Sequence, residues 1–483
     1  MPKLTPYSLF RKKPIDNDQI ADNDLARVIG MTTLIFYGVG GIVGTGLFSI
    51  TGIAISEHAG PAVILSFLMG AVACSFIGLC YSELASMVTV SGSSYSYTYI
   101  AFGEFIAWIV GWSLVLEYAV GAAAVAVSWS KYILSTLNGF GIYPDVRLIS
   151  SPFETYKLAD GSVGHGYLNL FSTFIIILLT FVLMRGIKES LRINNIVVFI
   201  KIFVILTMIG FGAFYIDFHN YHPFVIPNTG EFGHYGFSGI MQAAGMIIFA
   251  YIGFDSVSSA AQEIKNPSKN IPRAILIIIA VCAVIYVSFA CVIVGLVYYK
   301  DLIGDAAPVA TAINHIPFAW LQPLVKLSVI CGYVPILFLL LIGQTRIFYT
   351  LSKDGLIPAF FSKTHPKFKT PWSSHIFFMI VICLLSAFFP ISILSSMCSI
   401  GALTAFVFVC TSVIVLRRTH RNYPRKFKAP GGDIIPIIAT LTSLILMYSL
   451  NSLTWVMLLG WLAIGIVVYF CYGFKHSKLS NFK

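Results

Sequence analysis

The chain has 483 residues, of which 57% are hydrophobic and only 11% are charged, and its mean hydropathy is +0.85. Soluble globular domains carry about 25% charged residues, so this composition excludes a soluble protein and indicates an all-α polytopic membrane protein. The formal net charge of +11 raises the question of nucleic-acid binding, which the positions of the basic residues decide.

Twelve apolar runs are long enough to cross a bilayer, which takes about 20 residues each. Numbered as spans 1 to 12 in chain order, they lie near residues 32–55, 61–88, 102–136, 167–186, 194–216, 237–262, 272–299, 320–351, 374–390, 394–416, 434–451 and 455–474. The N-terminal tail before span 1 lacks the apolar core of a signal peptide. We therefore expect it to be a soluble cytoplasmic lead-in.

The basic residues are concentrated on one side of these spans. With the N-terminus in the cytoplasm, 25 of the 31 Lys and Arg residues fall in cytoplasmic tails and loops or in the span ends that adjoin them. This bias follows the positive-inside rule and predicts that both termini are cytoplasmic. The basic excess is therefore topological, and we expect no nucleic-acid partner.

Span 1 contains the stretch "GVGGIVGTGLF", residues 38–48, with five glycines in eleven residues. Each glycine costs a helix interior about 1 kcal/mol relative to alanine. Close helix packing is one explanation, and the four-residue spacing of Gly40 and Gly44 fits it. Packing at that spacing does not account for Gly38, Gly41 and Gly46, so we favour a helix that is broken at bilayer depth.

Span 6 shows a similar interruption in "FAYIGFDSVSS", which places Gly253, Asp255 and three serines at its centre. Interrupted segments at matching positions of two halves are the best sequence indication of a transporter site. The amides freed at a break attract a carboxylate, and the freed carbonyls attract an ammonium. A zwitterionic amino acid carries both groups, so the two breaks predict an amino acid site.

Several motifs in the same order resemble the amino acid–polyamine–organocation superfamily, and within it the cationic amino acid transporter family. Besides the two interrupted stretches, these are "YSELASMVTVSGSSYSYTYIAFGEFIAWIVGWSLVLEY", "GQTRIFYTLSKDGLIPAFFSKTHPKFKTP" and "YPRKFKAPGGDIIPI". The resemblance runs from about residue 25 to 475. It implies the leucine-transporter fold, in which two inverted repeats of five helices contain broken helices 1 and 6. A chain of twelve spans is similar to the bacterial form of the family.

The resemblance divides the chain into five parts. These are an N-terminal tail (1–30), a first repeat with spans 1–5 (31–216), a second repeat with spans 6–10 (237–417), spans 11 and 12 (418–474) and a C-terminal tail (475–483).

The resemblance also implies roles for residues at the two breaks. The carbonyl of Ile42 would bind the substrate ammonium, and backbone amides near Gly44, Thr45 and Gly46 would hold its carboxylate. In span 6, the carbonyls of Phe249, Ala250 and Ile252 would complete the ammonium site, and Phe254 would close over the substrate as an aromatic gate. The alternative for Phe249 and Phe254 is an ordinary place in the core.

Ionisable residues inside spans are functional candidates by default. Lys201 lies about 10 Å into span 5, at 1.5 Å per residue, and its stem could instead snorkel to the surface. The resemblance implies that its ammonium takes the place of Na⁺ between spans 1 and 8 and makes transport proton-coupled. For Glu117 in span 3, contact with the substrate side chain and a hydrogen bond to the broken helices are equal alternatives. Asp255 is expected to satisfy freed backbone amides, and Tyr333 to line the substrate pocket.

The sequence thus predicts a secondary active amino acid transporter that works by alternating access. We expect proton-coupled uptake of cationic or small neutral amino acids, with an amino acid or polyamine exchanger, or a membrane sensor, as alternatives. No catalytic constellation, metal-binding motif or nucleotide-binding GxxxxGK[ST] stretch is present, so we expect no enzyme activity, cofactor or metal. The expected setting is the bacterial inner membrane, with lipid, protons and the amino acid as partners, and a monomer or weak oligomer.

Overall fold

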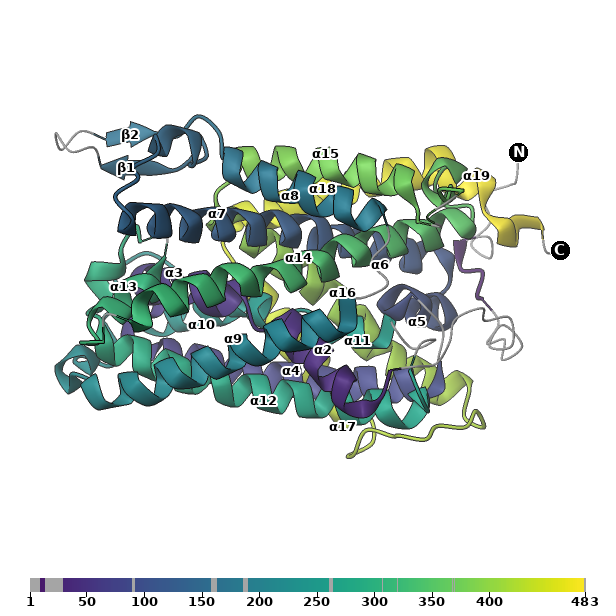
Figure 1. The fold of residues 1–483 in the computed structure, drawn as a ribbon. Helices are drawn as coiled ribbons and strands as arrows, with labels where there is room; N and C mark the ends of the chain where they lie inside the picture. The colour runs from purple at the N-terminus through teal and green to yellow at the C-terminus, as the bar shows by residue number, and fades with distance from the viewer. Residues whose placement is uncertain are drawn as a thin grey trace.

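The computed structural model shows a bundle of long helices running roughly side by side (Figure 1). It describes residues 9–13, 29–88, 92–157, 163–185, 190–259, 264–305, 307–318, 320–366, 368 and 370–481. Most of the predicted N-terminal tail therefore lies outside the described residues. The first and last described segments lie at the same end of the bundle (Figure 1), where Arg11 and Ser477 both bond Glu104, and we call this the terminal end.

The bundle is built from fourteen longer helices in the described residues. They are α2 (Met31–Ile42), α4 (Val63–Met87), α5 (Ser93–Phe102), α6 (Glu104–Val115), α7 (Gly121–Gly139), α8 (Leu170–Met184), α9 (Ser190–Gly212), α10 (Gly236–Tyr251), α12 (Pro267–Leu296), α14 (Leu321–Lys353), α15 (Trp372–Phe388), α16 (Ile391–Thr419), α17 (Ile434–Ser449) and α18 (Ser452–Val468).

Short helical pieces connect or continue them. The α-helical ones are α3 (Thr51–Ile53), α11 (Ser256–Ser259), α13 (Pro308–Asn314) and α19 (Phe474–His476), and the π-helical turns are Gly46–Ile50, Ala54–Ala59, Leu116–Val120 and Tyr469–Gly473. The 3₁₀ turns are Gly60–Ala62, Val146–Leu148, Ala213–Tyr215, Phe218–Tyr221, Tyr299–Leu302, Ala359–Ser362 and Lys478–Asn481.

Eight helical stretches in the described part are long and apolar enough to cross a membrane. They are Met31–Met87, Glu104–Gly139, Asn195–Tyr215, Gly236–Ser258, Pro267–Leu296, Leu321–Lys353, Ile391–Thr419 and Ser452–His476. Three shorter apolar helices, α8, α15 and α17, complete the set. The predicted class, a helical polytopic membrane protein, is confirmed.

A small antiparallel hairpin was not predicted. Strand β1 (Thr155–Lys157) pairs with β2 (Val163–His165), with Tyr156 opposite Gly164. The hairpin belongs to the loop between α7 and α8 and lies at the end of the bundle opposite the termini (Figure 1). We call this the hairpin end.

Burial separates the central helices from the peripheral ones. In the most apolar window of Glu104–Gly139, 94% of residues are buried within the protein, compared with 22% for Ser452–His476. The stretch Gly236–Ser258 follows with 83%. Because apolar surface that faces lipid need not be covered by protein, these values place α6, α7 and α10 at the centre and α18 at the rim.

A buried ion-pair cluster ties helices together at the terminal end. The guanidinium of Arg417, at the end of α16, donates to Glu83 of α4 at 2.5 and 2.9 Å. The same carboxylate accepts from the backbone amide of Ala429 at 2.8 Å and lies 3.6 Å from Arg425. Glu83 is only 2% exposed and Arg417 only 8%, so the pair is shielded from water.

We expect Glu83→Gln to lower the apparent melting temperature in detergent strongly, because it removes the buried counter-charge of Arg417 and leaves this guanidinium with the more exposed Asp433, at 3.3 Å. Breaking a buried pair in this way costs about 3–5 kcal/mol. Arg418→Gln is the matched control: its guanidinium is 70% exposed and pairs with Asp433 at 3.6 Å, and exposed pairs contribute about 0–1 kcal/mol. Equal shifts in scanning fluorimetry of the two variants would contradict this account.

Candidate functional site

The first break interrupts span 1 between α2 and the π-helical turn Gly46–Ile50. Helix α2 ends at Ile42, and Val43 is extended, with φ −68° and ψ 104°. The carbonyl of Gly44 then accepts from the amides of Leu47 and Phe48, both at 2.9 Å, which begins a new helix. The predicted break in span 1 is therefore present, at Val43 and Gly44.

The second break separates α10 from α11. Helix α10 ends at Tyr251, and Ile252 turns the chain out of the helix with ψ 138°. Gly253 has φ 118°, a conformation that only glycine adopts without strain. A Cβ on Gly253 would lie 3.3 Å from Cγ1 of Ile42, so the two breaks are direct neighbours.

The glycines of the first break also serve close packing. A Cβ would lie 2.2 Å from Ile278 at Gly38, 2.2 Å from Val198 at Gly40, 2.6 Å from Leu339 at Gly41, 1.9 Å from Ile336 at Gly44 and 2.2 Å from Ala250 at Gly46. The sequence argument set unwinding against packing, and the structure shows both. The sequence argument underestimated packing because the five glycines face four different helices. No single spacing in the sequence therefore marks them as packing residues.

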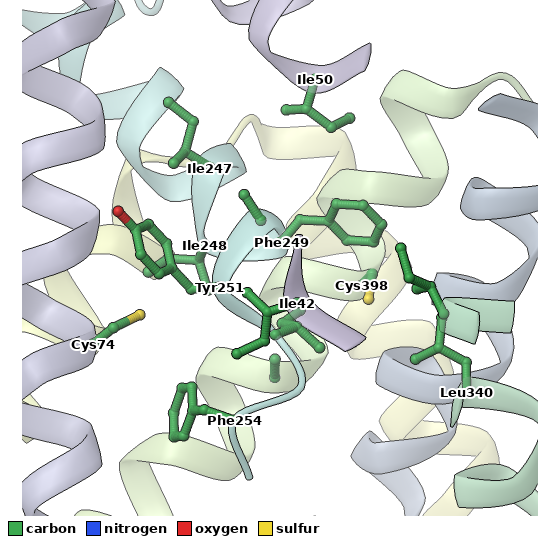
Figure 2. Packing of buried hydrophobic residues seen from close by; sticks show 14 of the residues in the cluster. Ile42, Ile50, Cys74, Ile247, Ile248, Phe249, Tyr251, Phe254, Leu340 and Cys398 are labelled. Atoms are coloured by element: carbon green, nitrogen blue, oxygen red, sulfur yellow. The ribbon is translucent and has the colours of Figure 1, made fainter. Parts of the chain in front are cut away.

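A pocket lies between the two breaks and the central helices. The space between its walls that protein atoms do not fill, open solvent included, is about 310 Å³. Its lining residues are Gly41, Ile42, Thr45, Gly46, Glu117, Gly121, Val125, Phe249, Ile252, Ile336, Leu340 and Cys398. Figure 2 shows Phe249, Leu340 and Cys398 around Ile42.

Half of this lining was among the predicted site residues: Ile42, Thr45, Gly46, Glu117, Phe249 and Ile252. The other half was missed, and it comes from α2, α7, α14 and α16. These residues carry no sequence signal of their own, because glycine, aliphatic residues and cysteine are common in any apolar helix. Only the packing of distant helices brings them to the breaks.

Four predicted residues lie beside the pocket rather than in its lining. Gly44 and Ala250 belong to the backbone of the breaks. Phe254 is fully buried, and its ring packs edge-on against Tyr81 at 5.4 Å and beside Phe406 at 5.5 Å. In Figure 2, Phe249 and Phe254 lie on opposite sides of Ile42. The gating role predicted for Phe254 stays a prediction.

Tyr333 belongs to a hydroxyl network rather than to the pocket wall. Its hydroxyl lies 2.7 Å from Ser128 of α7 and 3.4 Å from Ser49, and the two serine hydroxyls also bond each other. Because Ser49 follows the first break toward the hairpin end, this network covers that side of the pocket. From α14, Ile336 and Leu340 form the wall instead.

Tyr286 of α12 contacts both breaks and was not predicted. Its hydroxyl lies 2.8 Å from the carbonyl of Ala250 and 3.0 Å from that of Ile42. These are two of the four carbonyls expected to bind an ammonium. One hydroxyl hydrogen cannot satisfy two carbonyls fully, and each carbonyl has two lone pairs, so acceptor capacity is left for a ligand.

Lys201 of α9 also bonds backbone carbonyls of the first break. Its ammonium donates to the carbonyls of Gly40 at 2.8 Å, Val43 at 2.6 Å and Gly332 at 3.4 Å. The residue is 0% exposed, which rules out the snorkelling alternative. A Cβ on Gly332 would lie 2.6 Å from the lysine stem, so this glycine leaves room for the side chain. Lys201 therefore joins spans 5, 1 and 8.

Comparisons with known proteins show the family to which the sequence is similar. Residues 29–474 match the family described as amino acid permease. The chain is 41% identical to the branched-chain amino acid permease BcaP of Bacillus subtilis (strain 168), over 98% of this chain and 99% of that protein. It is 38% identical to the methylthioribose transporter of the same organism, over 98% and 100%. It is 34% identical to the vacuolar cationic amino acid transporter 4 of Arabidopsis thaliana, over 85% and 67%.

We expect Gly46→Ala to reduce amino acid uptake by about tenfold or more, and Gly44→Ala by a few-fold at most. A methyl group on Gly46 meets the Cα of Ala250, whereas one on Gly44 meets the flexible end of Ile336. Overpacking costs about 1–3 kcal/mol, and about 1.4 kcal/mol corresponds to tenfold. Uptake rates normalised to folded protein test this, and equal losses in the two variants would contradict it.

Proposed function

The chain belongs to the amino acid permease family, and from this premise we propose that it is a secondary active transporter that carries amino acids across a membrane by alternating access. The observation that carries the proposal is the pair of adjacent broken helices with a pocket between them. The relatives of the chain named above are permeases and transporters rather than enzymes.

The proposed architecture has twelve spans with a repeat of five plus five. The eight long stretches account for nine spans, because Met31–Met87 contains two of the predicted ones. The three shorter apolar helices bring the number among the described residues to twelve, which supports the proposal. The breaks fall in the first and sixth spans, which are matching positions of the two proposed halves. The first and last described segments share the terminal end of the bundle (Figure 1), which supports one side of the membrane for both, and the positive-inside rule makes that side cytoplasmic.

In the proposed binding mode, the backbone recognises the amino acid. The ammonium would bind the carbonyls of Ile42 and Ala250, to which the Tyr286 hydroxyl donates in this structure. The carboxylate would face the first amides after Gly44, because the opening amides of a helix have no carbonyl partner within it. Backbone recognition leaves the side chain to define specificity.

The pocket wall favours a neutral, aliphatic substrate side chain. Val125, Ile252, Ile336 and Leu340 are apolar and lie beside the breaks. A wall of this kind fits branched-chain amino acids, the substrate class that the name of one relative states. A cationic substrate is the second candidate, because Glu117 places a carboxyl group in the same wall.

A competition panel tests the substrate class. Purified protein in vesicles takes up labelled L-leucine, and unlabelled Leu, Ile, Val, Ala, Arg, Lys, ornithine, polyamines and methylthioribose compete. We expect the branched-chain amino acids to compete best. Competition by Arg and Lys alone would overturn the aliphatic assignment, and no uptake of any amino acid would overturn the proposed function.

Lys201 is the proposed coupling residue. Protonated, its ammonium bridges carbonyls on spans 1 and 8, as in this structure. Without the proton, the amine keeps fewer donors for these carbonyls and the bridge weakens. A proton that binds one state better than the other shifts the equilibrium between them, and the lysine occupies the space that a coupling Na⁺ would need.

We expect Lys201→Met to abolish accumulation of substrate driven by a pH gradient that is acidic outside. Wild type should accumulate substrate with or without Na⁺. Lys326→Met is the control, because the hydrogen bond of this α14 lysine among the described residues goes to the carbonyl of Ser135, at 3.3 Å, and not to either break. A requirement for Na⁺, or undiminished accumulation by Lys201→Met, would contradict proton coupling. Uptake only against unlabelled internal amino acid would indicate the exchanger.

A further inference from the structure

Three glycines line the pocket, and two of them serve the packing of helices. A Cβ on Gly41 would lie 2.6 Å from Leu339, which does not belong to the lining. A Cβ on Gly46 would lie 2.2 Å from Ala250, which does not belong to it either. These two glycines therefore allow the first break to approach its neighbouring helices. The third glycine, Gly121, has different surroundings.

Gly121 faces the side chains of the pocket wall. The three atoms nearest to an added Cβ would be Sγ of Cys398 at 3.1 Å and the two Cδ atoms of Leu340 at 3.7 and 3.8 Å. Both residues line the pocket, and in Figure 2 they lie on the same side of Ile42. Because pocket side chains surround the place of the missing Cβ, its absence leaves space at the pocket wall.

The backbone does not require a glycine at this position. Gly121 begins α7 with the ordinary helical angles φ −57° and ψ −46°, and alanine is a better helix former than glycine. The next three residues of α7 are alanines, and each of them is buried. Neither conformation nor helix propensity therefore explains the glycine, whereas the space that it leaves beside the pocket does.

The part of the pocket around Gly121 is the part that would hold the substrate side chain. In the binding mode proposed above, the two breaks hold the ammonium and the carboxylate. The remaining lining comes from spans 3, 8 and 10, and consists of Glu117, Gly121, Val125, Ile336, Leu340 and Cys398. A side chain that extends away from the breaks would therefore end against these residues.

We propose that Gly121 is a specificity-determining residue, which sets the depth of the side-chain subsite and admits the branched side chains of leucine, isoleucine and valine. This inference rests on the amino acid transport proposed above and assigns the selection by size to one position. A methyl group on Gly121 would bring the wall forward between Cys398 and Leu340, where the end of a branched side chain would lie. The short side chain of L-alanine does not extend that far.

Uptake of labelled L-leucine and L-alanine into vesicles that contain the purified protein tests the proposal. The measured quantity is the ratio of kcat/KM for L-leucine to kcat/KM for L-alanine. Gly121→Ala should lower this ratio by about 10- to 200-fold, which is the effect of one methylene group too many in an apolar pocket. Cys398→Ala should raise the ratio, because it removes the sulfur atom next to the missing Cβ. The double variant Gly121→Ala/Cys398→Ala should return the ratio toward the wild-type value.

Gly401→Ala is the matched control. Gly401 also lies where α16 packs against span 3, but it does not belong to the pocket lining. An added Cβ there would lie 2.6 Å from the Cβ of Leu116 and 3.0 Å from the carbonyl oxygen of Ser113. We expect this variant to reduce uptake of both amino acids by the same factor, because it disturbs packing and not the subsite.

Three results would overturn the proposal: an unchanged ratio in Gly121→Ala, an equal change of the ratio in Gly401→Ala, or a ratio in the double variant as low as in Gly121→Ala. If Gly121→Ala does not fold, Cys398→Ala decides, because a ratio that is unchanged or lowered there would also overturn it. Failure of the proposed function is a different result, since wild type would then take up neither amino acid. Wild-type uptake of both with an unchanged ratio in the variants would remove only the role of Gly121.

Discussion

The structure depends on one constraint: a backbone group freed inside a bilayer must find a partner. Breaking spans 1 and 6 frees carbonyls and amides where water is scarce. Side chains from other helices supply the missing donors. Lys201 from α9 bonds the carbonyls of Gly40 and Val43, and Tyr286 from α12 bonds that of Ile42. The first break is thus held by donors from two different helices.

This arrangement links the functions proposed for the breaks. Within four residues of span 1, the carbonyls of Gly40 and Val43 accept from the titratable ammonium of Lys201, and that of Ile42 accepts from the Tyr286 hydroxyl. We expect the substrate to displace this hydroxyl. Gly253 brings the second break against Ile42, and Asp255 connects that break with span 3 by accepting from the Tyr118 hydroxyl at 3.0 Å. A change in any donor therefore acts on the same few residues of backbone, so proton and substrate can influence each other without a long path between them.

The sequence predicts the local features of this site well and the long-range ones poorly. The breaks could be predicted because glycines and Asp255 contradict the apolar pattern around them. The depth of Lys201 followed from its position in span 5. Tyr286, Ile336 and Leu340 could not be found, because they look like any apolar helix and reach the pocket only through packing. The turn at Ile252 and Gly253 also reorients the chain, so helical spacing could not tell which of Phe249 and Phe254 faces the pocket.

The most direct test of the central claim is an experimental structure of the protein with bound L-leucine. The account predicts that the ammonium lies within hydrogen-bond distance of the carbonyls of Ile42 and Ala250, with the Tyr286 hydroxyl moved off at least one of them. The carboxylate should lie at the amides that follow Gly44. An amino acid bound away from both breaks, with the Tyr286 hydroxyl still on both carbonyls, would contradict the claim that the broken backbone forms the binding site.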